Sequence, residues 1–331
     1  MNERLIVELR NNVLECEHFG AICAVDEHRT LKWSLGDMQA PRFLRSAGKP
    51  FQIIPAVKHG MLEHYHLSEQ ELALMLSSHR GEDMHMETLN HIMHQSGLTE
   101  TVLQCAPSYP LNEAAKEKWL RSGGHEARRF HNCSGKHIGV LSWCKQQGYD
   151  LESYLEPDHP AQQEITAMII EMSEAQPEQV GRGKDGCGFP VYALPMPAIA
   201  TAYLKLACPD LIADPQTRDA VERIGHAMNA YPLIVGGTNR LDSVMMEDKN
   251  IVAKGGFKGI FGFALREERL GFAVKIGDGA DEECAYVVQS ILKQIGYKQT
   301  ATIERLEEAF PADIHNDQGE VVGQSKPVFQ L

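Results

Sequence analysis

The chain has 331 residues, of which 43% are hydrophobic and 23% are charged, and its formal net charge is −13. This composition is ordinary for a soluble globular enzyme, and the length fits one domain or two intimate lobes. So acidic a chain is a poor candidate for binding nucleic acid or anionic membranes, because both need clustered positive charge.

No targeting or membrane-spanning segment is predicted. The opening stretch MNERLIVELRNNVLE lacks the basic start and unbroken apolar run of a secretory signal. No run approaches the ~18 consecutive apolar residues that a membrane helix needs. Eight cysteines are scattered without a Cys-x-x-Cys pair, a pattern typical of reduced thiols. We therefore expect a cytoplasmic protein with no membrane partner.

Alternating and β-branched residues predict strands near the start of the chain, at 5–9, 20–25 and 30–35. The middle is mostly helical by apolar spacing, and Ser68 with Glu71 forms a capping box at one helix start. The helices expected beyond it are 82–95, 135–147, 161–173, 196–206 and 217–229. The strands expected after them are 243–247, 251–254, 260–265 and 272–276, followed by helix 281–295 and strand 320–329.

Strands at both ends with helices between them predict an α/β (α+β) fold. We expect one mixed sheet built from about 1–45 and 232–331, with a helical lobe over about 46–231 inserted between its halves. No stretch has the composition of a flexible linker. The expectation is therefore a single catalytic domain over 1–331 with two intimate lobes.

A Ser-x-x-Lys spacing at Ser46 and Lys49 is the first candidate for catalysis. If Ser46 starts a helix, Lys49 lies one turn later on the same face. A serine hydroxyl needs a neighbouring base to become a nucleophile, and a lysine of lowered pKa can serve as that base. The same spacing at 142–145 and 290–293 lies inside amphipathic helices, where we expect solvated surface pairs.

Ser78 and Lys254 follow in the order in which serine β-lactamases place their second serine and second lysine. Two ammonium groups in one pocket would lower each other's pKa, as a base requires. The residues alone leave a plainer alternative open, in which Ser78 caps the next helix and Lys254 is a solvated strand end.

Segments that run in order through nearly the whole chain resemble the L-asparaginase II family, the rhizobial-type asparaginases that are distinct from the threonine-dependent enzymes. The block from His131 to His137 together with Asp185 to Pro190 is the specific part of the resemblance. The matching segments are 45–52, 78–82, 131–137, 185–190, 253–256 and 275–279.

The resemblance implies a fold like the serine β-lactamases and glutaminases. It implies Ser46 as nucleophile with Lys49 as its base, while Ser78 and Lys254 relay protons and orient the substrate. Members of the family are similar in working as homodimers. Four residues beside these motifs are expected to bind substrate, although His79 is equally a packing residue. They are His79, Arg80, Asp185 and Gly186.

The resemblance also implies zinc near the site, bound by Cys133, Lys136 and Cys187. Spacing alone would not show this, because no tetrahedral finger pattern is present and 131–137 also reads as a turn that caps a helix. Lys136 is an unusual ligand, since an amine must lose its proton before it coordinates. We expect such an ion to position substrate or stabilise structure, not to supply the nucleophile.

Three positions depart from the family pattern. Arg80 stands where the family usually has a small residue, Lys258 where it usually has glutamate, and Gly48 replaces a common alanine. Arg80 and Lys258 add positive charge near the expected pocket, so they bear on the choice of amide.

The resulting hypothesis is an L-asparaginase that uses a lysine-activated serine. The alternatives are a glutaminase or other amino-acid amide hydrolase on the same scaffold, and a zinc-binding sensor without turnover.

Overall fold

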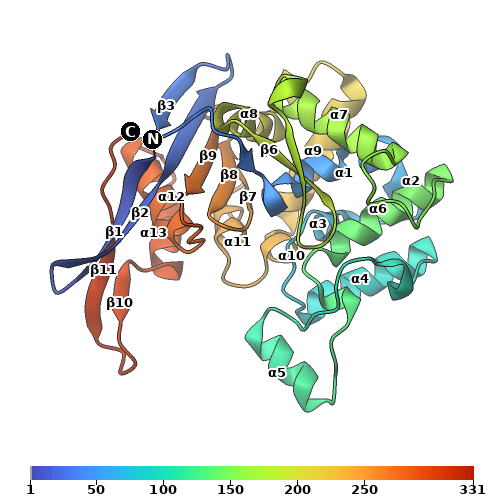
Figure 1. Ribbon diagram of the computed structural model, residues 1–331, viewed down its shortest axis with the longest axis horizontal. Coiled ribbons are helices and arrows are strands. Elements are labelled where there is room, and N and C mark those ends of the chain that lie inside the picture. Colours follow the sequence, from blue (N-terminus) through green and yellow to red (C-terminus); the bar gives the residue numbers. More distant parts are fainter. Residues whose placement is uncertain (1) are drawn as a thin grey trace.

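The protein is described from a computed structural model that covers residues 2–331. Its main sheet has the strand order β10-β11-β1-β2-β9-β8-β7, and β3 pairs with β2 beside this path. Strands from the two ends of the chain therefore lie side by side (Figure 1). The strands are β1 (Glu3–Arg10), β2 (Val13–Asp26), β3 (Leu31–Leu35), β7 (Ile251–Gly255), β8 (Ile260–Leu265), β9 (Leu270–Ile276), β10 (Asp313–His315) and β11 (Val321–Pro327).

The long strand β2 joins the two parts of this sheet. Its first half pairs with β1, and its second half pairs with β9. Gly20 lies where the two ladders meet, and a Cβ there would be 2.1 Å from the carbonyl oxygen of Lys275. Only glycine lets the backbones approach so closely, so this position fixes how the N-terminal hairpin joins the C-terminal strands.

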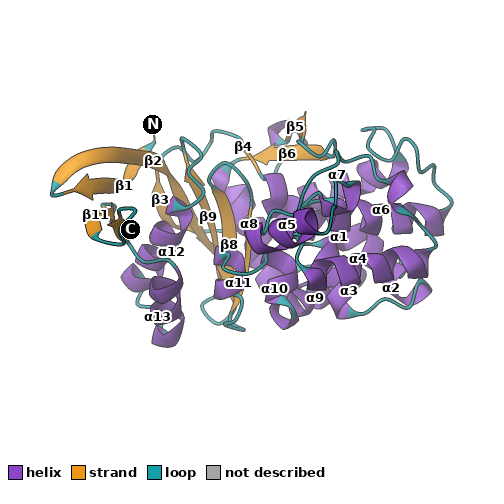
Figure 2. Cartoon of the chain, turned by 90° about the horizontal axis from the view of Figure 1, so that it is seen from below, coloured by secondary structure: helices purple, strands orange, loops and turns teal. Residues whose placement is uncertain are grey.

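Helices from the middle of the chain form a lobe beside the sheet (Figure 1). The helices before the last strands are α1 (Lys49–Lys58), α2 (Met61–His64), α3 (Glu69–Met75), α4 (Asp83–Ser96), α5 (Glu113–Arg121), α6 (Ser134–Gln147), α7 (Pro160–Ser173), α8 (Met196–Ala207), α9 (Pro215–Ala230), α10 (Pro232–Gly236) and α11 (Leu241–Met245). The C-terminal helices are α12 (Glu283–Gln294) and α13 (Thr300–Ala309). Figure 2 shows the sheet between the C-terminal helices and the helical lobe. A small sheet of order β4-β6-β5 adds β4 (Arg42–Phe43), β5 (Gly181–Lys184) and β6 (Pro190–Leu194).

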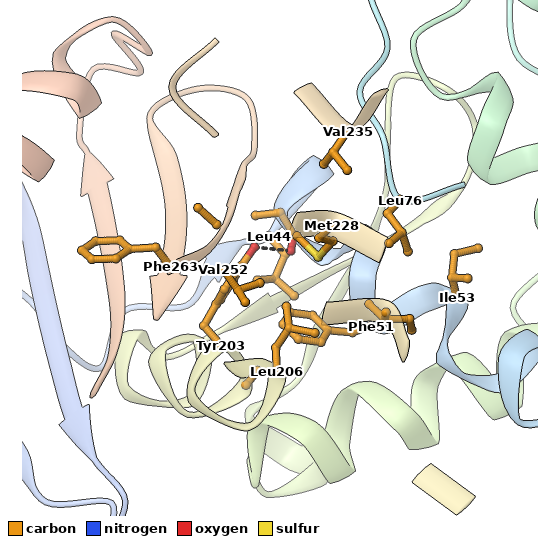
Figure 3. Close-up of a cluster of buried hydrophobic side chains, with 14 of the residues drawn as sticks. Leu44, Phe51, Ile53, Leu76, Tyr203, Leu206, Met228, Val235, Val252 and Phe263 are labelled. Atoms are coloured by element: carbon orange, nitrogen blue, oxygen red, sulfur yellow. Dashed lines mark hydrogen bonds between the residues drawn. The ribbon is translucent and has the colours of Figure 1, made fainter. Parts of the chain in front are cut away.

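A buried cluster centred on α8 connects the sheet to the helical lobe (Figure 3). The ring of Tyr203 packs edge-on against Phe51 of α1 at 5.3 Å between centroids. Its hydroxyl donates to the carbonyl oxygen of Ala47 at 2.6 Å and lies 3.2 Å from that of Lys254. This one phenol therefore holds the turn before α1 against strand β7, and these are the two segments that carry Ser46 and Lys254.

The predicted fold class is confirmed, with a sheet drawn from both ends of the chain around an inserted helical lobe. The ladders described are all antiparallel, where a mixed sheet was expected, because neighbouring strands are mostly joined by short hairpins. Within residues 2–331, no helix is both long and apolar enough to cross a membrane. Division into a single domain with two lobes stays a prediction.

Some predicted elements are wrong or were missed. The expected strand 243–247 is wrong, because Leu241–Met245 forms helix α11. Strands β5 and β6 interrupt the region expected to be helical, and α5 and α13 were not predicted. Ser142 was expected on a solvated face, but it is fully buried within α6.

Candidate active site

Two of the predicted serines and one of the predicted lysines line a single cavity of about 190 Å³ between the helical lobe and the sheet. Ser46 reaches it from the 3-10 turn Arg45–Gly48, and Lys254 reaches it from β7. The cavity is smaller than the ~300–1,000 Å³ sites that take drug-sized ligands, so it suits a small substrate. Its lining residues are Ser46, Ser78, Arg80, Asn132, Gly236, Arg240, Asp242, Lys254, Gly255, Gly256, Phe257 and Asp281.

Lys49, the first residue of α1, lies behind the cavity wall and is 1% exposed. Its Nζ donates to the carbonyl oxygen of Ser77 at 2.5 Å and lies 3.2 Å from Ser78 Oγ and 3.3 Å from the carbonyl oxygen of Asn132. Burial lowers the pKa of Lys49 below its ordinary value. The charge of Cys133 acts in the opposite direction, and the positive charges of Lys136 and Lys254 add to the lowering. The surroundings therefore favour a neutral amine.

Lys254 is also buried, but it has a carboxylate partner. Its Nζ lies 2.6 Å from Asp242 Oδ2 and 3.1 Å from the carbonyl oxygen of Gly255. Burial alone would raise the pKa of Asp242, but the charge and hydrogen bond of Lys254, together with Arg240 and the backbone N–H of Gly255, outweigh it and the pKa is lowered. The pair is therefore an ammonium bound to a carboxylate, and Lys254 contributes a fixed positive charge to the cavity.

The hydrogen bonds do not follow the predicted serine–lysine pairing. Among the residues described, no hydrogen bond joins Ser46 Oγ to Lys49, and none joins Ser78 to Lys254. Lys49 instead contacts Ser78. The structure thus brings all four residues together while leaving the order of proton transfer among them as a prediction.

The backbone just before Ser46 is in an unusual conformation. Arg45 has φ = +50°, a left-handed conformation that is uncommon for a residue with a side chain. Its guanidinium lies 2.6 Å from Asp185 Oδ1 and 5.5 Å from the ring centre of Phe257. These contacts hold the turn in which Ser46 lies.

The four predicted substrate-binding residues lie in different surroundings. Arg80 lines the cavity, whereas His79 is fully buried, with its Nε2 2.7 Å from Ser134 Oγ. Asp185 accepts hydrogen bonds from Arg45 and from the backbone N–H of Gly186. Neither Asp185 nor Gly186 lines the cavity. Contact with substrate stays a prediction for the set.

The predicted zinc ligands converge in a buried place. Cys133 and Cys187 are 5% and 3% exposed, and Lys136 Nζ lies 3.8 Å from Cys187 Sγ. A hydrogen bond from Cys187 lowers the pKa of Cys133 well below its ordinary value, and Lys49 lowers it further. The same hydrogen bond and burial raise the pKa of Cys187. Two thiols that share a proton beside an amine fit a thiophilic ion such as zinc.

One contact works against Lys136 as a ligand. Its Nζ lies 3.9 Å from the ring centre of Phe189, which favours a charged ammonium. Zinc binding there would require this amine to lose its proton.

Several cavity residues lie outside the motifs from which the site was predicted. Arg240 and Asp242 follow α10, Phe257 lies between β7 and β8, and Asp281 lies between β9 and α12. Lys254 makes its ion pair with Asp242 twelve residues earlier. A buried lysine requires a partner, so that requirement was the only available hint of Asp242.

Comparison with known proteins gives weak structural matches and one strong match to a family. No curated protein matches the chain. Among solved structures, a Bacillus glutaminase matches with 14% identity and a TM-score of 0.40, over 85% of this chain and 92% of that one. The protein Mglu matches with 16% identity and a TM-score of 0.35 over 88% of this chain, which spans 60% of that one. A mutant of simvastatin synthase LovD from Aspergillus terreus matches with 15% identity and a TM-score of 0.39, over 78% and 86% of the two chains.

The sequence profile of the L-asparaginase II family matches residues 6–327, which is nearly the whole chain. All the segments considered above lie inside this range. The chain therefore belongs to the L-asparaginase II family.

Proposed function

We propose that this protein is an amidohydrolase that converts L-asparagine and water to L-aspartate and ammonia, with Ser46 as nucleophile and Lys49 as the base. Membership of the L-asparaginase II family supports amide hydrolysis. The observation that carries the proposal is the buried Lys49 amine in contact with Ser78 Oγ, at the wall of a cavity that Ser46 also lines.

The contacts of Lys49 suit a base. A neutral amine has two N–H groups and one lone pair, and the carbonyl oxygens of Ser77 and Asn132 can accept both N–H groups. The lone pair is then free to accept the hydroxyl proton of Ser78, 3.2 Å away. Ser78 therefore suits the role of a relay between Ser46 and Lys49.

The proposed reaction has two acyl-transfer steps. Ser46 Oγ attacks the side-chain amide carbon, and its proton passes through Ser78 to Lys49. Backbone N–H groups beside Ser46 stabilise the oxyanion, and the C–N bond breaks as Lys49 returns the proton to the leaving ammonia. Water then attacks the ester, releases aspartate and restores the Ser46 hydroxyl.

Serine substitutions test the nucleophile. Ser46→Ala is expected to lower asparagine turnover by roughly 10⁴-fold or more with the fold retained. Ser290→Ala, in an equivalent Ser-x-x-Lys spacing on α12, is the matched control and should keep wild-type activity. If Ser46→Ala keeps wild-type hydrolysis while Ser78→Ala loses it, the assignment of the nucleophile is wrong.

A second substrate class is favoured by the guanidinium groups in the cavity. Arg80 and Arg240 both line it. Burial lowers the pKa of Arg80, and repulsion from the charge of Arg240 lowers it further. One such group suits the α-carboxylate of asparagine, and a second suits an amide that carries another acidic group. Ammonia release across a panel with asparagine, glutamine and acidic amides separates these candidates.

Cys133, Lys136 and Cys187 are the residues that would hold zinc, and the thiol pair fits it. Such an ion would supply positive charge that fixes these three side chains beside Lys49. Ammonia release with and without a chelator tests whether turnover depends on it. Zinc binding with no ammonia release from any amide would favour the sensor alternative. A cytosolic homodimer also stays our expectation.

A further inference from the structure

A cluster of carboxylates surrounds one imidazole where β1, β2 and α12 meet, and none of its members lines the candidate active-site cavity. Glu8 comes from β1, His18 from β2 and Glu283 from the first turn of α12, while Asp278 lies in the loop before α12. Helix α12 contacts β1, and the two lie near each other in Figure 1.

The imidazole of His18 is held from both sides. Its Nδ1 lies 2.7 Å from Asp278 Oδ2, and its Nε2 lies 2.9 Å from Glu8 Oε1. A carboxylate on one ring nitrogen fixes the tautomer and aims the other nitrogen, as it does behind histidines that bind metals. His18 as a whole residue is 9% exposed, so bulk water does not compete strongly for the hydrogen bond at Nε2.

Glu283 lacks a partner that its burial requires. It is 3% exposed, and its Oε2 is buried without a hydrogen-bond partner. Single donor atoms of Glu8, His18 and Glu283 all lie within 4.8 Å of one another. The unpartnered carboxylate is therefore directed toward the same point as the other two groups, and not toward solvent.

The charges of the cluster do not balance. A protonated His18 would neutralise only one of the three carboxylates that surround it. The cluster therefore lacks positive charge among the side chains described, and a buried carboxylate needs a cation or a proton.

We propose that Glu8, His18 and Glu283 bind one divalent transition-metal ion, with Asp278 orienting His18 from behind. One imidazole nitrogen and two carboxylates form a donor set that suits ions such as Mn²⁺ and Zn²⁺. Donors in a tetrahedral zinc site lie roughly 3.3 Å apart, so small side-chain rotations would close this one. The ion would fasten α12 to β1 and β2. This site is separate from the cysteine pair and makes no use of thiols.

Titration with Mn²⁺ tests the site, because thiolates are poor ligands for this ion. Chelator-treated protein is dialysed, and free Mn²⁺ is followed by electron paramagnetic resonance. The wild type, the neighbouring exposed control Glu282→Gln and the double variant Cys133→Ser/Cys187→Ser are each expected to bind one equivalent. Glu283→Gln and His18→Ala are expected to bind at least about tenfold more weakly.

Thermal melts give a second measurement that does not depend on activity. At about 100-fold above Kd, Mn²⁺ should raise the Tm of the wild type by roughly 4 °C and leave Glu283→Gln unchanged. Glu283→Gln should itself fold, since a neutral amide removes the unpaired charge. The proposal is overturned if the Cys133→Ser/Cys187→Ser variant binds neither Mn²⁺ nor Zn²⁺, or if Glu283→Gln binds Mn²⁺ as tightly as Glu282→Gln.

Discussion

Lys49 and Lys254 are both buried at one cavity, yet their surroundings give them different charges. Lys254 bonds a carboxylate, whereas Lys49 contacts only carbonyl oxygens and a hydroxyl. A charge without a directly bonded counter-charge is costly in a dry site, so burial favours the neutral form of Lys49 even though the charge of Cys133 opposes this. Two lysines of the same burial thus suit different roles, Lys49 that of the proposed base and Lys254 that of a fixed cation.

This difference predicts the pH dependence of kcat/KM. The base must be neutral to act, so activity should rise with pH as Lys49 loses its proton, with an apparent pKa below the ordinary lysine value of 10.5. The measurement is kcat/KM across pH for asparagine. An arginine cannot lose its proton, so Lys49→Arg should abolish turnover and with it the rise of kcat/KM with pH. Activity that falls across the same range would contradict a neutral lysine base.

The left-handed backbone conformation of Arg45 predicts that Asp185 positions the turn that carries Ser46. Asp185→Asn weakens the ion pair that holds the turn before Ser46, so kcat should fall by roughly 10- to 100-fold while KM changes little. Steady-state kinetics check this, with the exposed Asp219→Asn as control. A rise in KM at constant kcat would instead mean that Asp185 binds substrate.

At the scale of single residues, the sequence predicted much of the site and missed its partners. Ser46, Ser78 and Lys254 could be grouped because each lies in a short motif. Arg240 and Asp242 could not, because they meet the motifs only through folding. Lys49 and Ser78 are 29 positions apart in the chain, and no spacing rule predicts a contact between them.

Among the elements, α3 has the clearest start signal in the chain. Ser68 Oγ accepts the backbone N–H of Gln70, and Glu71 accepts the backbone N–H of Ser68 at 2.7 Å. Ser68→Ala should therefore lower the free energy of unfolding by about 1 kcal/mol. Urea unfolding measures this. The exposed Ser34→Ala should stay within about 0.5 kcal/mol of wild type, and equal effects of the two would refute the cap.

The same scale shows why some elements escaped prediction. Helix α11 is five residues long, so no periodicity can develop in it, and its valine and methionine also suit a strand. Strand β5 is Gly-Arg-Gly-Lys, which lacks every β-forming residue and exists because β6 offers a partner. Long helices such as α4 and α7 were found because their buried faces repeat at helical spacing over fourteen residues.

For the whole molecule, Glu174 connects the turn after β2 to the helical lobe. It lies 2.7 Å from Arg29 and 2.7 Å from Lys205 of α8. The hydrogen bond from Arg29, with further contributions from Lys205, lowers the pKa of Glu174 from 4.5 to about 2. A carboxyl with a depressed folded pKa stabilises the fold above its unfolded pKa, and this contribution is lost as pH falls toward the folded value.

Glu174→Gln should therefore destabilise the protein at pH 7 by about 0.5–1 kcal/mol, a modest effect because the side chain is partly exposed to solvent. The difference from wild type should shrink below pH 4.5 and vanish near pH 2. Chemical unfolding at several pH values measures it. Glu178→Gln, an exposed neighbour, is the control. A difference that persists unchanged into acid would exclude the ion pair as its source.

The phenol of Tyr203 links carbonyl groups that lie 207 positions apart, at Ala47 and Lys254. During synthesis, the ribosome releases Ser46 and Lys49 long before the strand that carries the second lysine exists. A nascent chain therefore contains the proposed nucleophile, Ser46, before the residues that would surround it. Catalytic competence should arrive late and abruptly, when the final hairpins close onto α8.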